Sequence, residues 1–252
     1  MKELPNIKSA ARKLCERLER NEKTGGQILV AYDFDGTVLD TMAAHGILAA
    51  ECMHAEFGTE YEEAKRLYHS TTGIPFPKQL EKIYPNEPAG KREACEKKYR
   101  SRKTDEVYRA TEPFPEAKMT FEETKVFGTT MQTIASSTEA RLIRELTDKY
   151  DLTKYFEMIW GCDEGDKNQH MAHMRGKYHV SAVIFVGDSA SDVKLKEKGA
   201  DMTIGKAGPP EKGMLTPEQL VEAGADYASE DLLDIPKILK VLGALHKHTL
   251  TG

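Results

Sequence analysis

Apolar residues along this chain occur in short unbroken runs and, between the runs, at helical spacing. Residues 28–32 (Ile-Leu-Val-Ala-Tyr) form an unbroken run of strand length, which is typical of a strand covered on both faces. Similar runs predict further strands at residues 129–135, 156–160, 182–186, 202–204 and 225–227. The segments between them predict helices at residues 116–126, from 136–139 onward, and at 168–177, 192–198, 217–223 and 231–245. This alternation predicts an α/β fold with a doubly wound parallel sheet, in which ligands bind at the carboxyl ends of the strands.

Two segments depart from this alternation. Apolar residues at helical spacing predict an amphipathic helix over residues 6–22. Residues 41–115 contain charged, helix-prone stretches separated by proline-rich turns, and they show no strand pattern. We therefore expect an N-terminal helical extension that packs on the core (1–27), an α/β core (28–40 and 116–252) and a smaller all-helical insertion (41–115).

Composition narrows the class of protein. With 252 residues, of which 39% are hydrophobic, the chain is long enough for one sizeable core and an accessory domain. The net charge of -5 gives no basic footprint for nucleic acid, and no apolar stretch is as long as a membrane span. Residues 1–5 lack the charged-then-apolar plan of a secretion signal, so we expect a cytoplasmic protein with neither nucleic acid nor membrane as a partner. The four cysteines form no Cys-x-x-Cys pair and are expected to be reduced, while the choice between monomer and homodimer stays open.

Polar residues recur where the predicted strands end. Asp33 and Asp35 follow the first strand, Ser136 follows the second, Lys167 lies after the third, and Asp188 follows the fourth. The Asp-Phe-Asp tripeptide alone is more typical of an ordinary turn, but the buried strand before it and the polar residues downstream favour a site. Carboxylates suit magnesium, while a lysine, a hydroxyl and exposed amides suit phosphate oxygens. The sequence therefore predicts a site for phosphate and magnesium at one edge of the sheet.

These segments resemble the motifs of the haloacid dehalogenase superfamily of hydrolases. Residues 33–40 (Asp-Phe-Asp-Gly-Thr-Val-Leu-Asp) match the first motif, residues 134–136 the second and residues 187–192 the fourth. Lys167 stands for the third, although Asn168 follows it where the family often has proline. The resemblance covers residues 28 to 245. It implies a Rossmann-like core of the phosphoglycolate phosphatase-like branch, with residues 41–115 as a helical cap over the active site.

The resemblance also implies roles for individual residues. Asp33 would be the nucleophile that forms an aspartyl-phosphate, and Asp35 would be the acid and base. Magnesium would be bound by Asp33, the main-chain carbonyl of Asp35 and Asp188. The residues implied for phosphoryl binding are Ser136, Ser137 and Lys167, and those implied for supporting positions around the ligands are Thr37 and Asp192. For Asp192 the ordinary interpretation, an acidic residue favoured in the first turn of a helix, has equal weight.

The presence of Asp35 bears on the reaction. Relatives that cleave carbon–halogen or carbon–phosphorus bonds usually lack an aspartate there, so this chain is expected to hydrolyse the phosphomonoester of a small metabolite. The alternative is a phosphomutase of the β-phosphoglucomutase type. In such mutases an arginine commonly follows the glycine turn of the cap loop, and here Pro75 and Phe76 follow Gly73 and Ile74 instead. A non-catalytic binding domain is a third hypothesis, which the complete set of catalytic residue types disfavours.

The insertion offers few firm contacts for a substrate. Thr72, in the cap loop, and Arg100, in the basic run at residues 97–103, are candidate contacts. The ordinary interpretation of a charge run, a solvated helix face, is more probable for residues 97–103. Of the three histidines at positions 45, 54 and 69, one is a candidate to meet the substrate. Finally, Ser136 or Ser137 is expected to cap the helix that opens at residues 136–139.

Overall fold

The computed structural model describes residues 4–20, 27–72, 74–126, 130–178 and 180–249. Its centre is a six-stranded sheet in which all paired strands are parallel, in the order β3-β2-β1-β4-β5-β6. The strands are β1 Ile28–Tyr32, β2 Thr130–Ala135, β3 Met158–Trp160, β4 Ala182–Gly187, β5 Met202–Lys206 and β6 Tyr227–Ser229. The strand order reverses between β1 and β4, where sheets of this kind leave a crevice for ligands. The predicted fold class is confirmed.

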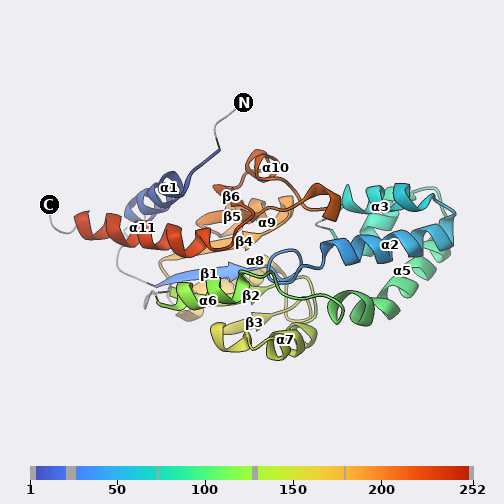
Figure 1. Cartoon of the computed structure of the whole chain (residues 1–252), viewed down its shortest axis with the longest axis horizontal. Coiled ribbons are helices and arrows are strands. Elements are labelled where there is room, and N and C mark those ends of the chain that lie inside the picture. Colours follow the sequence, from blue (N-terminus) through green and yellow to red (C-terminus); the bar gives the residue numbers. More distant parts are fainter. Residues whose placement is uncertain (1–3, 21–26, 73, 127–129, 179, 250–252) are drawn as a thin grey trace.

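Helices cover both faces of the sheet (Figure 1). Val30 and Tyr32 of β1 belong to the apolar cluster formed with α1 (Ile7–Arg20), α6 (Ala117–Val126) and α11 (Asp234–Thr249). Leu29 and Ala31 belong to the cluster on the other face, with α8 (Lys167–Tyr178). Because successive side chains of a strand point to opposite faces, a strand buried on both faces needs an unbroken apolar run, as residues 28–32 have.

The remaining helices of the α/β part follow the predicted order, with one difference in type. They are α7 Ala140–Lys149, α9 Ala190–Val193 and α10 Pro217–Glu222. The helix expected over residues 192–198 starts earlier, because Ser189 and Asp192 form a reciprocal capping box at its beginning. It remains α-helical only through Val193 and continues as a 3₁₀ helix over Lys194–Lys198, which ends at Gly199.

The N-terminal helix α1 is amphipathic, as predicted, and it packs along α11 (Figure 1). An ion pair also ties it to the sheet: Arg17 donates to both carboxylate oxygens of Asp226, at 2.9 and 2.8 Å. Burial alone would raise the pKa of Asp226, but the hydrogen bonds and charge of Arg17 outweigh it and hold the pKa below its usual value. Lys196 contacts the same carboxylate at 3.3 Å.

Replacing Arg17 with methionine is expected to lower the free energy of unfolding by about 2 to 3 kcal/mol, because a buried carboxylate loses its main partner while Lys196 remains. Arg12→Met, at an exposed position of the same helix, is the matched control and should change little. The native pKa of Asp226 is depressed, so its contribution is present above the ordinary aspartate pKa and fades as pH falls below it. Urea unfolding at pH 7 and pH 3 measures both effects. Equal losses in the two variants would contradict this account of α1.

Four helices and a π-helical turn form a separate layer beyond the carboxyl ends of the strands (Figure 1). We call α2 (Met42–Phe57), α3 (Tyr61–His69), α4 (Phe76–Ile83) and α5 (Ala89–Lys103) the cap helices; the turn is Thr104–Tyr108. They enclose an apolar cluster of their own, which includes Leu48, Met53, Leu80, Cys95 and Val107. No named strand lies in the described part of residues 41–115, in agreement with the all-helical prediction.

The chain enters and leaves the cap helices along neighbouring segments. The amide of Phe114 donates to the carbonyl of Val38 at 3.1 Å, and the amide of Asp40 donates to the carbonyl of Glu112 at 3.0 Å. These paired segments place the cap helices next to the turn that follows β1. The residue boundaries of the three predicted parts stay a prediction.

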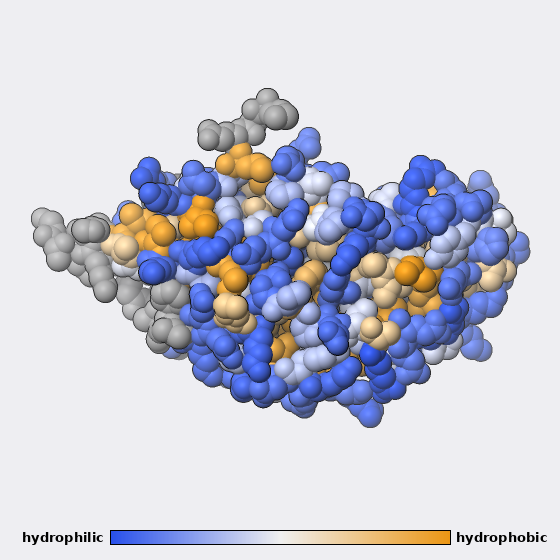
Figure 2. All heavy atoms as spheres, in the orientation of Figure 1, coloured by the Kyte–Doolittle hydropathy of each residue, from blue (hydrophilic) through white to orange (hydrophobic). Residues whose placement is uncertain are grey.

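The surface is mainly hydrophilic on the face shown in Figure 2, with hydrophobic side chains gathered toward the α11 end. Within the described ranges, no helix has the length and apolar character needed to cross a membrane. All four cysteines are free, and three of them are buried.

Candidate active site

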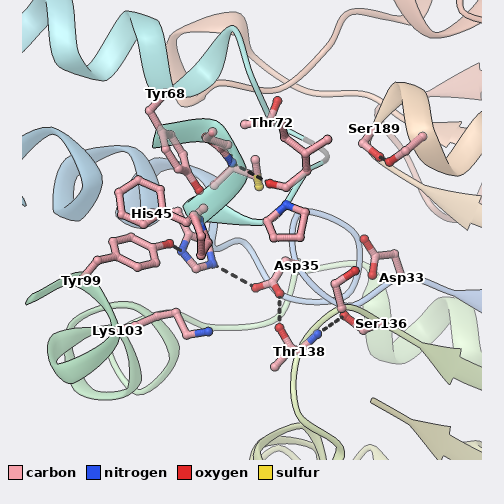
Figure 3. Close-up of a pocket in the computed structure, with 18 of the residues that line it drawn as sticks. Asp33, Asp35, His45, Tyr68, Thr72, Tyr99, Lys103, Ser136, Thr138 and Ser189 are labelled. Carbon is pink, nitrogen blue, oxygen red and sulfur yellow. Dashed lines mark hydrogen bonds and ion pairs between the residues drawn. The ribbon is translucent and has the colours of Figure 1, made fainter. Parts of the chain in front are cut away.

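A cavity of about 420 Å³ lies between the carboxyl ends of the central strands and the cap helices. Asp33 and Asp188 line it from the ends of β1 and β4, and Ser136 lines it from the end of β2. His45, Tyr68 and other side chains line it from the cap helices (Figure 3). The sheet therefore brings together the polar residues that were predicted to meet at its edge, and the cap helices enclose them.

The turn after β1 depends on close packing. The amide of Asp33 donates to the carbonyl of Val186 in β4 at 2.8 Å, which carries the strand pairing into the turn. Gly36 follows with φ at 67°, a conformation that side chains other than glycine's disfavour. A Cβ atom at this position would also stand 2.4 Å from a carboxylate oxygen of Asp188. A glycine is therefore required for the turn to lie against Asp188.

Three carboxylates meet at the sheet edge. Asp33, Asp188 and Asp192 are all buried and offer oxygen atoms within 4.8 Å of one another. Burial, followed by the neighbouring carboxylates Asp192 and Asp35, raises the pKa of Asp33 to about 6 despite the charge of Lys167. Burial, with Asp192 and Asp33, raises the pKa of Asp188 well above its usual value.

This cluster suits a divalent cation. One lysine faces three carboxylates, and oxygen Oδ1 of Asp33 is buried without a hydrogen-bond partner among the described residues. A hard cation such as magnesium takes oxygen ligands and would offset the excess negative charge. Both oxygens of Asp192 already accept hydrogen bonds, so Asp33 and Asp188 are the side chains that would hold the ion.

Lys167 connects Asp33 with Asp192. Its ammonium group lies 3.0 Å from Oδ2 of Asp33 and 2.6 Å from Oδ1 of Asp192. The other oxygen of Asp192 accepts from the hydroxyl of Ser189 at 2.6 Å. Asp192 thus lies beside Lys167 and also in the first turn of α9, so both interpretations given to it describe its position. Lys167 itself is the first residue of α8, while it had been expected in the preceding loop.

Asp35 lies apart from the carboxylate cluster and has four side-chain partners. Its Oδ1 contacts the hydroxyl of Thr41 at 2.9 Å and Nε2 of His45 at 3.2 Å. Its Oδ2 accepts from the hydroxyls of Tyr108 at 3.1 Å and Thr138 at 2.7 Å. Burial would raise the pKa of Asp35, but the hydrogen bond and charge of His45, with hydrogen bonds from the two threonines, outweigh it and lower the pKa. The predicted metal contact through its main-chain carbonyl stays a prediction.

Sequence reasoning missed most of the residues that surround Asp35. His45 was one of three candidate histidines; its Nδ1 lies 2.6 Å from the hydroxyl of Tyr99, which extends the chain of polar contacts from Asp35 into α5 (Figure 3). A signal existed for His45, because it stands one helical turn after Thr41 directly behind the first motif. Tyr99 and Tyr108 gave no signal, since only the packing of α5 and the π-helical turn brings Tyr99 to His45 and Tyr108 to Asp35.

The loop after β2 contributes hydroxyl groups. Ser136 is buried and its hydroxyl accepts from the amide of Thr138 at 3.2 Å, whereas Ser137 is exposed at the cavity. Neither serine caps α7, so that prediction was wrong. The N-cap residue is Glu139, which makes no side-chain cap, and the amide of Ala140 donates to Asp163 at 2.8 Å. A carboxylate from the loop after β3 therefore takes the place that a local serine was expected to fill.

The remaining residues predicted for the site do not all line the cavity. Thr72 lines the cavity, and its hydroxyl donates to the carbonyl of His69 at 3.0 Å. Arg100 also lines it, but its side chain is 72% exposed and paired with Glu96, so it lies at the rim. Thr37 is buried in the turn and is not among the cavity-lining residues. Gly73 of the cap loop lies outside the described residues.

Comparison with known families agrees with the site that this geometry indicates. A family model described as haloacid dehalogenase-like hydrolase matches residues 30–204, which include the turn after β1, the cap helices and the loop after β4. The match spans more than half of the chain. This protein therefore belongs to the haloacid dehalogenase-like hydrolases. No match to the sequence was found among the curated proteins.

Solved structures share the fold. A predicted phosphatase from Clostridium acetobutylicum superposes with a TM-score of 0.67 at 21% identity, over 86% of this chain and 100% of that chain. A predicted phosphoglycolate phosphatase from Haemophilus somnus gives 0.67 at 14% identity, over 84% and 97%. A protein named as a β-phosphoglucomutase from Thermotoga maritima gives 0.58 at 20% identity, over 84% and 98%. At these identities the likeness establishes the fold.

Proposed function

We propose that this protein is a magnesium-dependent phosphatase that hydrolyses the phosphomonoester of a small metabolite through an aspartyl-phosphate on Asp33. The observation that carries the proposal is the separation of two aspartates from one turn. Asp33 lies in the carboxylate cluster beside Lys167, and Asp35 lies in the hydroxyl and imidazole group on the cap side. Asp33 thus lies on the side of the cavity that holds Lys167, and Asp35 lies on the side of the cap helices, as a nucleophile and an acid/base catalyst on opposite sides of the ester bond require.

The first half-reaction transfers the phosphoryl group to Asp33. The carboxylate of Asp33 attacks phosphorus, and the bond from phosphorus to the ester oxygen breaks. Asp35, which is ionised in the free protein because its pKa is lowered, takes up a proton when the substrate binds and passes it to the departing oxygen. Lys167, Ser136 and Ser137 bind the phosphoryl oxygens, with Lys167 supplying the positive charge. Asp192 holds Lys167 in place and thereby positions that charge.

The second half-reaction releases phosphate. Asp35 removes a proton from water, the water oxygen attacks phosphorus, and the bond to Asp33 breaks. A bound magnesium ion supplies charge neutralisation between two anions, the carboxylate and the phosphoryl group. Asp33 and Asp188 would hold the ion, and the family resemblance implies that the carbonyl of Asp35 would complete the protein ligands.

The cap helices are proposed to be a cap domain over residues 41–115. They supply His45, Tyr68 and Tyr99 to the cavity wall, so they exclude water and shape the space for the alcohol part of the substrate. A phosphomutase is the second candidate, and the structural likeness to a protein named as a β-phosphoglucomutase favours it. Pro75 and Phe76 line the cavity where such mutases commonly have an arginine, which is why hydrolysis stands first.

Removal of metal is the experiment that tests the proposal. Chelation with EDTA is expected to lower release of phosphate from an aryl phosphate by at least roughly 100-fold, and added magnesium is expected to restore it. Magnesium should also raise the unfolding temperature of the wild type more than that of Asp188→Asn, because a ligand that binds the native state stabilises it. Full activity in chelated, metal-free protein would contradict the proposal, and formation of an isomeric phosphate without phosphate release would favour the mutase.

Replacing His45 with leucine is expected to lower kcat for alkyl phosphates by about 10- to 100-fold, because Asp35 loses the partner that positions it. The loss should be smaller for aryl phosphates, whose leaving groups need no proton. His54→Leu is the matched control, since His54 lies in the same helix and contacts the carbonyl of Thr59 on the surface.

A double-mutant cycle separates this role from a merely structural one. His45→Leu should have little further effect in an Asp35→Asn background, because both residues then act on the same step. Independent, additive losses would show that His45 does not act through Asp35.

A further inference from the structure

Lys103 is a cation of the cavity wall for which the structure shows no ion-pair partner among the described residues. It is the last residue of α5 and lines the cavity. Among the residues that the structure describes, no carboxylate lies within ion-pair distance of its ammonium group. Of the other cations in this part of α5, Lys98 pairs with Glu56, Arg100 with Glu96, and Arg102 with Glu51 and Glu106, while Lys97 is exposed and does not line the cavity. These side chains agree with the solvated helix face predicted for the basic run, whereas Lys103 lacks an ion pair with any described residue and lines the cavity.

The position of Lys103 relates it to Asp35. Its ammonium group lies 5.4 Å from the ring centroid of Tyr108, and the hydroxyl of the same ring donates to Asp35 at 3.1 Å. The ammonium group of Lys103 and the carboxylate of Asp35 therefore both contact the same tyrosine. In Figure 3 the side chain of Lys103 points toward Asp35 and Thr138, from the side away from Asp33.

Lys103 and Lys167 have different neighbours in the cavity wall. Lys167 is held by Asp33 and Asp192 on the side where the phosphoryl group is transferred. Of the other carboxylates that line the cavity, Glu96 is paired with Arg100, and Glu139 is exposed at the rim without an ion pair to Lys103. A cavity of about 420 Å³ has room for a small metabolite that reaches from Lys167 to Lys103.

We propose that Lys103 binds an anionic group on the alcohol part of the substrate, so that the preferred substrates are small phosphomonoesters carrying a carboxylate or a second phosphate a few bonds from the ester oxygen. This inference rests on the proposed phosphatase function and adds the class of substrate to it. An ammonium group beside a cavity of limited size favours a compact anion, because a charge-assisted hydrogen bond there is stronger than a neutral one.

The test compares matched substrates. Phosphoglycolate carries a carboxylate, ethane-1,2-diol bisphosphate carries a second phosphate, and 2-hydroxyethyl phosphate carries neither. In the wild type, kcat/KM for an anionic member is expected to exceed that for the neutral member by about tenfold or more, which corresponds to roughly 1.4 kcal/mol. Whichever anionic member shows this preference identifies the group that Lys103 binds.

Variants assign the preference to Lys103. In Lys103→Met the ratio of anionic to neutral kcat/KM should fall about tenfold, mainly through KM, and Lys103→Arg should retain most of it. Lys98→Met, in the same helix, is the matched control and should keep the wild-type ratio. A ratio that is unchanged in Lys103→Met, or a wild type without preference for either anion, would overturn the assignment while hydrolysis itself continued.

A binding measurement separates this proposal from the proposed function. Calorimetric titration of phosphoglycolate and of the bisphosphate into the Asp33→Asn variant, with magnesium in the buffer, needs no turnover. A tenfold weaker affinity after adding Lys103→Met supports the anion site even if no compound is hydrolysed, in which case only the phosphatase proposal fails. Equal affinity in the two proteins overturns the anion site.

Discussion

Asp33→Asn is expected to abolish turnover of every phosphomonoester, with a loss of roughly 10⁴-fold or more, as is found when a catalytic nucleophile is removed. An amide oxygen is a poor nucleophile toward phosphorus, so no covalent intermediate forms. The protein should remain folded, because the substitution removes one of three mutually repelling buried carboxylates. Steady-state phosphate release measures the loss, and urea unfolding checks the fold.

The matched control for this variant is Asp105→Asn. Asp105 lies on the π-helical turn, with its side chain 72% exposed and paired with Arg109. It should keep wild-type activity. Residual activity above one-tenth of the wild-type value in Asp33→Asn would exclude Asp33 as the nucleophile.

Asp35→Asn has the second largest expected effect, and the effect depends on the substrate. General acid–base catalysis contributes roughly 10²- to 10⁴-fold, so kcat for alkyl phosphates should fall by about that amount. An aryl phosphate has a leaving group that departs without a proton, so transfer to Asp33 should be affected less than the later attack of water. The aspartyl-phosphate is then expected to accumulate, visible as a burst of aryl alcohol in stopped-flow measurements. A uniform loss for all leaving groups, without a burst, would contradict the acid/base role.

The fold was predictable from the sequence because its elements are locally determined. The unbroken run at residues 28–32 and its counterpart at 182–186 correspond to β1 and β4, which are buried on both faces. The amphipathic pattern over residues 6–22 corresponds to α1. The ends and the type of individual helices were harder to predict from the sequence, because they depend on a few capping contacts. The shift to a 3₁₀ helix after Val193 is one example, and the cap of α7 by Asp163 is another, because that carboxylate comes from a distant loop.

Part of the candidate site could also be predicted from the sequence, and part of it could not. Asp33, Ser136 and Asp188 stand at ends of strands, so the parallel sheet alone brings them together. Tyr99, Tyr108 and Lys103 come from a helix and a turn of the insertion, and their positions depend on how the cap helices pack. Tyr108 contacts Asp35, Tyr99 contacts His45, and Lys103 lies over the ring of Tyr108. Periodicity places a residue on a helix face, but it does not tell which neighbour that face meets. The surroundings of Asp35 therefore required the structure.

Mass spectrometry of the acid-quenched Asp35→Asn variant during turnover of an aryl phosphate tests whether Asp33 forms a covalent phosphoryl intermediate. We expect the mass of one phosphoryl group on the peptide that contains Asp33, present with magnesium and lost when the double variant with Asp33→Asn is used. Turnover by Asp35→Asn with every peptide unmodified, or with the phosphoryl group on a different residue, would contradict the account.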